Sequence, residues 1–344
     1  MKMDNTIIDF IKRNTNCSST EILQGIAEKK SIATVKRFLS KSIAEKLIIS
    51  TGQGKATRYS LSPYYMLFQH IDMERYYERE IDERTINENF NFSLITDILP
   101  QVSLFMKEEM DKLNELQKVY TKNKSELSDL EYKKELERLA IDLSWKSSQI
   151  EGNTYSLLET ERLLRERETA QGKSKEEADM LLNHKDTINF ILKNPDYLFP
   201  LTISKIEDIH SMLVKELGVE RNLRKRRVGI SGTNYRPIDN EFQIREALLE
   251  MCTLINGKKS VFEQAFLALI LISYIQPFVD GNKRTARIVS SAILTNNNYC
   301  PISFRTVDSV DYKKAMLLFY EQNNVTAFKN VFIEQFEFAV STYF

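Results

Sequence analysis

Apolar residues near the start of the chain follow a helical period and then change to the alternation of a hairpin. They recur every three to four positions in three successive stretches, which predicts three amphipathic helices. Ser18 or Ser19 is a suitable N-cap for the second helix, and Ser31 for the third. Residues 47–50 and 58–61 favour strands and flank a glycine-containing turn, which predicts a two-stranded hairpin.

Three helices followed by a hairpin resemble a winged helix-turn-helix domain, which we expect over residues 1–66. The third helix of such a domain can enter a major groove, while cations of the wing meet phosphates. The chain as a whole carries 48 basic and 48 acidic residues, but residues 1–66 carry 11 Lys and Arg against 5 Asp and Glu. This fold also serves as a protein–protein module, so DNA is one of two expected partners. The candidate DNA-contacting cations are Lys36, Arg37, Lys55 and Arg58.

The rest of the chain reads as helical. We expect residues 67–140 to form a mostly polar helical connector. The stretch 125–142 is dense in Glu and Lys, which predicts one long solvated helix. The core is expected over residues 141–344, where 262–275 is apolar all round and predicts a wholly buried helix. Only 10 Gly and 7 Pro occur in 344 residues, and so few turn residues favour a mainly α fold.

Several classes of protein are excluded by the composition. The cysteines, Cys17, Cys252 and Cys300, lie far apart and have no metal-ligand or disulfide spacing. The start has no apolar run long enough for a signal peptide, and the longest apolar stretch, Ala265–Ile272, is far short of a membrane span. We therefore expect a cytoplasmic protein without membrane contact, and the sequence leaves a homo-oligomer open.

Candidate chemistry is concentrated between residues 276 and 287. A helix is stopped by Pro277, a tight loop turns at Gly281, and a new helix begins near Asn282. A helix N-terminus after a glycine turn presents free backbone N–H groups, and Asp280 can hold a divalent cation at its mouth. These features predict an anion pocket suited to a metal-bound polyphosphate. The cations that complete it are Lys283, Arg284 and Arg287.

This stretch resembles the signature of the Fic (Fido) family, HxFx(D/E)GNxRxxR. The resemblance implies a helical core with a small β-hairpin flap that transfers AMP from ATP to a hydroxyl of a target protein. It implies that Asp280 binds Mg²⁺ and that Gly281, Asn282, Arg284 and Arg287 contact the ATP phosphates. Lys283 is a further phosphate-binding candidate because it is a cation on the same turn. The matching residues are Pro277, Phe278, Asp280, Gly281, Asn282, Arg284, Thr285 and Arg287.

A second segment, near residues 144–153, looks like the family's inhibitory helix motif, (S/T)xxxE(G/N). Its matching residues are Ser147, Glu151 and Gly152, and the first two share one helix face because they are four apart. The resemblance implies that Glu151 pairs with Arg287 and blocks productive ATP binding. A carboxylate that neutralises a phosphate-binding guanidinium competes with the phosphate.

A third segment, residues 228–237, resembles the family's flap, a hairpin that aligns the target segment by strand-like pairing. The alternative is a hairpin with only a structural role, which would show the same sequence pattern. The candidate docking residues are Ile230, Gly232, Thr233 and Tyr235.

Two residues depart from the family pattern. Gln276 stands where the family has the histidine that acts as general base, and an amide cannot accept a proton productively. Lys283 replaces the usual second glycine, as it does in the kinase-like branch related to the Doc toxin. We therefore predict an adenylyltransferase inhibited by Glu151, with its activity in question. The alternatives are a nucleotide-binding pseudoenzyme or regulator acting through the winged helix, and a Doc-like phosphotransferase that uses Lys283.

Overall fold

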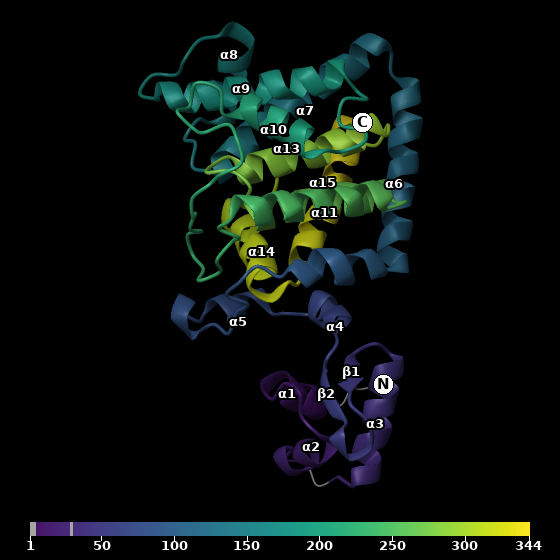
Figure 1. Ribbon diagram of the computed structural model, residues 1–344. Helices are drawn as coiled ribbons and strands as arrows, with labels where there is room; N and C mark the ends of the chain where they lie inside the picture. The colour runs from purple at the N-terminus through teal and green to yellow at the C-terminus, as the bar shows by residue number, and fades with distance from the viewer. Residues whose placement is uncertain (1–4, 28–29) are drawn as a thin grey trace. The chain divides into compact units, whose positions relative to one another are not determined.

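The computed structural model describes residues 5–27 and 30–344. They form two compact units, which Figure 1 displays and which we treat separately. One unit holds the described residues up to Ile71 together with Gln322–Thr326, and the other holds Asp72–Glu321 and Ala327–Phe344. Helices make up 64% of the structure and strands 3%, which confirms the mainly α fold. None of the helices in the described ranges is long and apolar enough to cross a membrane.

The N-terminal unit has the predicted order of elements. Ser18 and Ser31 cap its second and third helices, and Ile48 of the hairpin packs in one core with Val35 and Leu39 of the third helix. Three helices and an antiparallel hairpin are therefore confirmed, while the winged helix-turn-helix assignment stays a prediction. The elements are α1 (Asn5–Arg13), α2 (Ser19–Gly25), α3 (Ile32–Ala44), β1 (Ile48–Thr51), β2 (Arg58–Leu61) and α4 (Pro63–Phe68).

The candidate DNA-contacting cations lie on α3 and on the hairpin. Lys36 and Arg37 are exposed on α3, and Lys55 is exposed between the two strands. Arg58, at the start of β2, is half-buried. DNA binding by these residues stays a prediction.

The larger unit is built from helices joined by irregular segments. Residues 78–106 hold only short 3₁₀ and π turns, so the expected helical connector is interrupted there. The helices are α5 (Met73–Tyr77), α6 (Lys107–Glu126), α7 (Asp129–Ile150), α8 (Leu157–Glu166), α9 (Lys175–Lys193), α10 (Ile203–Leu213), α11 (Glu241–Gly257), α12 (Val261–Ile275), α13 (Asn282–Asn296), α14 (Ser309–Gln322) and α15 (Thr326–Tyr343).

Helices α12 and α13 form the centre of this unit. Every residue from Ala265 to Ile275 of α12 is buried, which confirms the prediction of a wholly buried helix. Helix α12 packs against α11 and α13, and α13 packs against α7, α9 and α10. The turn between α12 and α13 is therefore held in place by several layers of helix.

The expected single helix over 125–142 is wrong. Helix α6 ends at Glu126 and α7 begins at Asp129, because Ser128 caps α7. The Ser128 hydroxyl accepts a hydrogen bond from the Glu131 backbone N–H at 3.3 Å, and the Glu131 carboxylate accepts one from the Ser128 N–H at 2.9 Å. The sequence signature of this reciprocal capping box is Ser-x-x-Glu, which is present at residues 128–131. Residues 139–142 are also buried rather than solvated.

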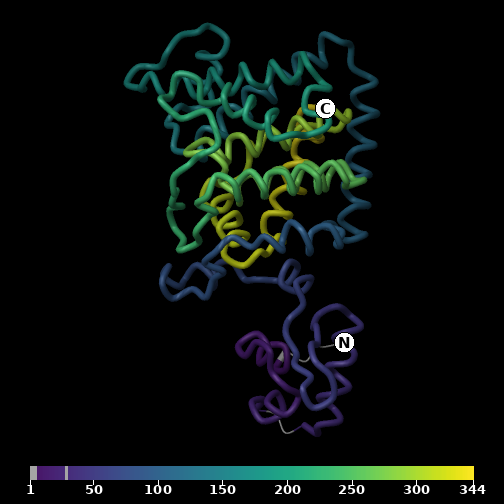
Figure 2. Tube along the Cα trace, in the orientation of Figure 1, coloured from purple at the N-terminus to yellow at the C-terminus, as the bar shows by residue number. Residues whose placement is uncertain are grey.

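The flap segment lies in residues 214–240, which Figure 2 traces as one long loop between α10 and α11. Within residues 228–237, all of them described, a turn forms at Ser231–Gly232 but no pair of strands does. The backbone N–H of Arg236 instead donates to the carbonyl of Glu88 at 2.7 Å. The flap therefore differs from the expected hairpin, because its returning arm bonds to another segment.

Candidate active site

The predicted turn between two helices is present. Helix α12 is capped by Gln276 in a left-handed conformation (φ 52°), and Gly281, also left-handed (φ 80°), precedes α13. The Asn282 side chain closes the turn: its Nδ2 donates to the Phe278 carbonyl at 2.8 Å and its Oδ1 accepts from the Phe278 N–H at 2.8 Å. Gly281 is the N-cap of α13 and has no side chain with which to cap the helix. The first backbone N–H groups of α13 are therefore available to an anion.

A cavity of about 360 Å³ lies beside this turn. Its walls come from the end of α7, the first arm of the flap, the turn itself and one face of α14. Its lining residues are Ile150, Glu151, Val228, Gly229, Ile230, Ser231, Gln276, Val279, Asp280, Gly281, Asn282, Lys283, Lys313, Met316, Leu317 and Tyr320.

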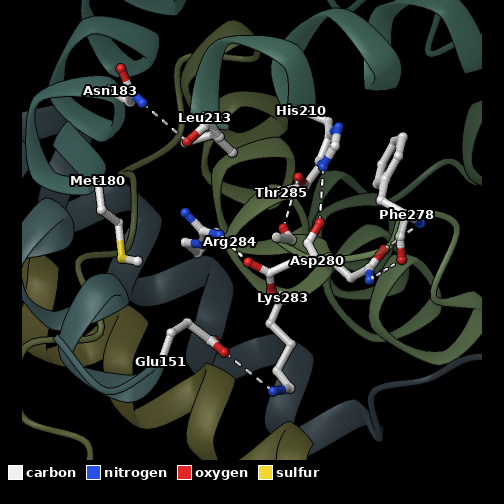
Figure 3. Close-up of polar contacts among 12 residues, drawn as sticks. Glu151, Met180, Asn183, His210, Leu213, Phe278, Asp280, Lys283, Arg284 and Thr285 are labelled. Atoms are coloured by element: carbon white, nitrogen blue, oxygen red, sulfur yellow. Dashed lines mark hydrogen bonds and ion pairs between the residues drawn. The ribbon is translucent and has the colours of Figure 1, made fainter. Parts of the chain in front are cut away.

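Two buried arginines of α13 lie behind the cavity wall: neither lines the cavity, but Arg284 pairs with Asp280 and Arg287 with Glu151, and both carboxylates line it. Arg284 and Arg287 are 2% and 0% exposed. Arg284 donates from Nη2 to Asp280 at 2.9 Å, as Figure 3 shows, while its buried Nε and Nη1 have no hydrogen-bond partner. Leaving a buried charged donor unpaired costs free energy, so these N–H groups favour the arrival of an anion.

The carboxylate of Glu151 is held by two cations of α13. Its Oε1 accepts from Nη2 of Arg287 at 2.8 Å, and its Oε2 lies 3.3 Å from Nζ of Lys283, a contact drawn in Figure 3. Burial alone would raise the pKa of Glu151, but the charges of Arg287 and Lys283 outweigh it and lower the pKa to about 2. At neutral pH Glu151 is therefore ionised, and its negative charge is paired with Arg287 and Lys283.

The local sequence explains why α7 ends at this point. Glu151 is the C-cap, and Gly152 follows with φ 103°, a conformation that glycine adopts without strain. One turn earlier, the Ser147 hydroxyl accepts from Nε of Arg287 at 2.8 Å. The structure thus pairs Glu151 with Arg287, as the motif led us to expect, and adds a bond from Arg287 to Ser147 that was not expected. The inhibitory role of both residues stays a prediction.

Two histidines that the sequence analysis did not assign support the site. Nε2 of His184 lies 2.8 Å from the Ser147 hydroxyl, and Nε2 of His210 lies 2.9 Å from the carbonyl of Asp280. The His210 ring also stacks on Phe278, with the centroids 3.6 Å apart. Burial lowers both pKa values, that of His210 to about 4, so we treat both rings as neutral at pH 7. Each lies on the apolar face of its helix, a pattern that more often marks a structural histidine.

Arg224 is another residue that the sequence analysis did not assign a role. It is fully buried, and its guanidinium bonds three carbonyls: Gln276 at 2.6 Å, Arg226 at 2.9 Å, and Ile238. The base of the flap is thereby fixed to the turn that carries the candidate chemistry.

The candidate docking residues of the flap differ in their position relative to the cavity. Ile230 lines the cavity, whereas Gly232 and Thr233 do not. Tyr235 is only 2% exposed, its hydroxyl donates to the carbonyl of Tyr274 at 3.1 Å, and its ring stacks on Tyr274. The Tyr235 side chain is therefore not available to a target, because it anchors the flap, while docking along the flap backbone stays a prediction.

Gln276 is locked by its own hydrogen bonds. Its Nε2 donates to the Ser273 carbonyl at 2.6 Å, and its Oε1 accepts from Asn282 at 3.0 Å. Neither His184 nor His210 lines the cavity.

Asp280 is the candidate Mg²⁺ ligand. Its carboxylate is 64% exposed at the cavity, where it also pairs with Arg284. No group of three or more His, Cys, Asp or Glu residues suited to a metal occurs in the described ranges. A single hard carboxylate still fits Mg²⁺, which takes its remaining ligands from phosphates and water.

Comparison with known proteins places this site in a family. The family model described as Fic/DOC family matches residues 200–294, which include the flap, the turn and most of α13. The chain contains a Fic/DOC family domain. The curated relatives include several with the name protein adenylyltransferase Fic. The one from Nematostella vectensis is 25% identical over 221 residues, 62% of this chain and 51% of its own. The one from Drosophila melanogaster is 27% identical over 158 residues, 44% and 32% of the two chains.

Solved structures match the fold of the Fic domain. Fic-1 (residues 134–508) from C. elegans superposes with a TM-score of 0.59 at 19% identity, covering 68% of this chain and 71% of that one. A Fic domain-containing signaling protein from Bacteroides thetaiotaomicron gives 0.55 at 19% identity, covering 69% and 94%. The chain spans about half or less of the curated relatives' length, so their activity is a proposal for this protein.

Proposed function

We propose that the protein binds ATP at the turn before α13 and transfers AMP to a hydroxyl group of another protein. The observation that carries this proposal is the pair of buried arginines behind the cavity wall, with guanidinium N–H groups of Arg284 unpaired. The Fic/DOC domain and the relatives named protein adenylyltransferases support AMP transfer at the level of the family.

The triphosphate would lie at the N-terminus of α13. Backbone N–H groups after Gly281 and the guanidinium groups of Arg284 and Arg287 would neutralise its charge. Asp280 would hold Mg²⁺, which supplies further positive charge to the phosphates. Glu151 competes with the phosphates for Arg287, so we propose that it restrains the reaction.

The chemistry forms one bond and breaks another. The acceptor hydroxyl oxygen attacks the α-phosphorus, and the bond from that phosphorus to the bridging oxygen breaks, releasing pyrophosphate. The hydroxyl proton must leave during this step, and Gln276 cannot take it. In this chain the proton passes to solvent, and the expected rate is low because transfer relies on positioning and charge neutralisation.

Labelled ATP tests the proposal. We expect label from α-³²P-ATP, and none from γ-³²P-ATP, to appear on protein after incubation with Mg²⁺. Label from only the γ position would contradict AMP transfer and favour a phosphotransferase that uses Lys283. Binding of ATP without label from either position would favour a regulator.

The regulator is the second candidate, and the locked amide of Gln276 favours it. Such a protein would sense ATP and act through its N-terminal unit. We then expect the full chain to shift the band of duplex DNA in a gel at low salt. The double variant Lys36→Glu/Arg37→Glu should abolish the shift, because contacts to DNA phosphates are lost. Lys193→Glu, an exposed lysine on α9, serves as the control and should retain it. If the full chain shifts no DNA at any salt concentration, DNA binding is contradicted and the N-terminal unit is better explained as a protein-binding module.

A further inference from the structure

The tip of the flap is held by a side chain from outside the flap. Arg84 lies in the irregular segment between α5 and α6, and its Nη2 donates to the carbonyl of Gly232 at 2.8 Å. Gly232 is exposed and left-handed (φ 89°), so it forms the turn of the flap. Its neighbour Ser231 lines the cavity. The Arg84 contact therefore fixes the turn directly beside the cavity wall.

Arg84 is an unusual residue to bury. It is 8% exposed, and its Nη1 lies 3.4 Å from Oε1 of Glu321, which is fully buried. The other oxygen of Glu321 accepts from the Tyr76 hydroxyl at 2.7 Å, and the Arg84 guanidinium lies 5.1 Å from the centre of the Tyr77 ring. A buried ion pair adds little stability beyond what apolar residues of the same volume would give. A fixed guanidinium does, however, define the position of the group it bonds.

The flap depends on such anchors because no pair of strands forms within residues 228–237. Arg224 fixes its base to the turn that carries Gln276, and Arg84 fixes its tip to a different segment. The returning arm has contacts of its own, from Asn234 to Asp82 at 2.8 Å and from Arg236 to Glu88 at 2.7 Å. Arg84 is the side chain that bonds the turn residue Gly232 itself, where the first arm ends.

We propose that Arg84 is a positioning residue that presets the edge of the flap for docking of the acceptor segment. This inference rests on the proposed function, which assigns the acceptor hydroxyl to a protein. An extended acceptor segment would pair with the backbone of residues 228–231, so the edge must be straight before the segment arrives. The side chains of Arg84 and Glu321 contact Gly232, Tyr76 and each other rather than the residues proposed to hold ATP, so we expect ATP binding to be unaffected by their removal.

Hydrogen exchange of the flap tests this directly. The variant is Arg84→Met/Glu321→Gln, which removes the guanidinium without leaving a buried carboxylate unpaired. We expect exchange of amides in 228–237 to rise about tenfold, while exchange in α12 and α13 stays unchanged. Arg84→Lys keeps a charged donor and should give a smaller rise. Arg79→Met, at an exposed arginine of the same region, is the matched control and should give none.

Kinetics separate docking from a merely structural role. In a Gln276→His/Glu151→Gly background, the double variant should raise KM for the acceptor protein about tenfold and leave KM for ATP and kcat unchanged. Unchanged exchange in the flap would overturn the inference, as would faster exchange with an unchanged acceptor KM. If no AMP transfer occurs at all, the proposed function fails, while the exchange result still shows whether Arg84 holds the flap.

Discussion

Gln276→His should raise the rate of AMP transfer by about 10²- to 10⁴-fold, the range that a positioned general base contributes. Histidine tolerates the left-handed conformation of this position (φ 52°) better than most residues. The imidazole would stand in the cavity wall beside Tyr320 and Asn282, where it can take the proton from the acceptor hydroxyl. Transfer of label from α-³²P-ATP to protein measures the gain.

The control for this prediction is Gln276→Leu, which has a similar size but no proton acceptor. It should give no gain. If Gln276→His also gives none, even when Glu151→Gly is added, the site is not organised for AMP transfer.

Glu151→Gly should tighten binding of Mg²⁺-ATP about 10- to 100-fold. The carboxylate pairs with Arg287 at 2.8 Å, and hydrogen bonds to charged groups contribute about 1.5–3 kcal/mol each. The same change should lower the thermal stability of the nucleotide-free protein, because Arg287 loses its buried partner. Calorimetry and thermal unfolding measure the two effects. Affinity and stability should therefore change in opposite directions, whereas a structural role alone would change only stability.

The pH dependence of stability gives an independent check on Glu151. Its pKa is about 2 in the folded protein against 4.5 for an unperturbed glutamate. The resulting stabilisation, on the order of 3 kcal/mol, is fully present above pH 4.5 and is lost as the pH falls toward 2. Denaturant unfolding of Glu151→Gln should lack this loss. Glu161→Gln, in an exposed ion pair with Arg165, should unfold like the parent chain.

The centre of the site was predictable from the sequence because its residues are close together in the chain. Pro277, Gly281 and Asn282 predicted a turn between helices, and the spacing of Ser147 and Glu151 predicted one helix face. The capping box at Ser128 was equally local but was outweighed by the high charge around it, which suggested one continuous helix.

The supports of the site could not be predicted in the same way. Arg84, Arg224 and His210 each bond a carbonyl that lies 52 to 148 positions away along the chain, and a carbonyl carries no side-chain signature. Tyr235 looked available in a flap sequence, yet the aromatic cluster around Tyr274 buries it. Contacts of this kind depend on how the helices pack, and no local pattern records them.

The most direct test is a crystal structure of Glu151→Gly grown with ATP and Mg²⁺. The account predicts the triphosphate in the cavity at the N-terminus of α13, bonded to Arg284 and Arg287, with Asp280 on the metal. A nucleotide bound elsewhere, or an empty cavity with Arg284 still paired to Asp280 at saturating ATP, would contradict it.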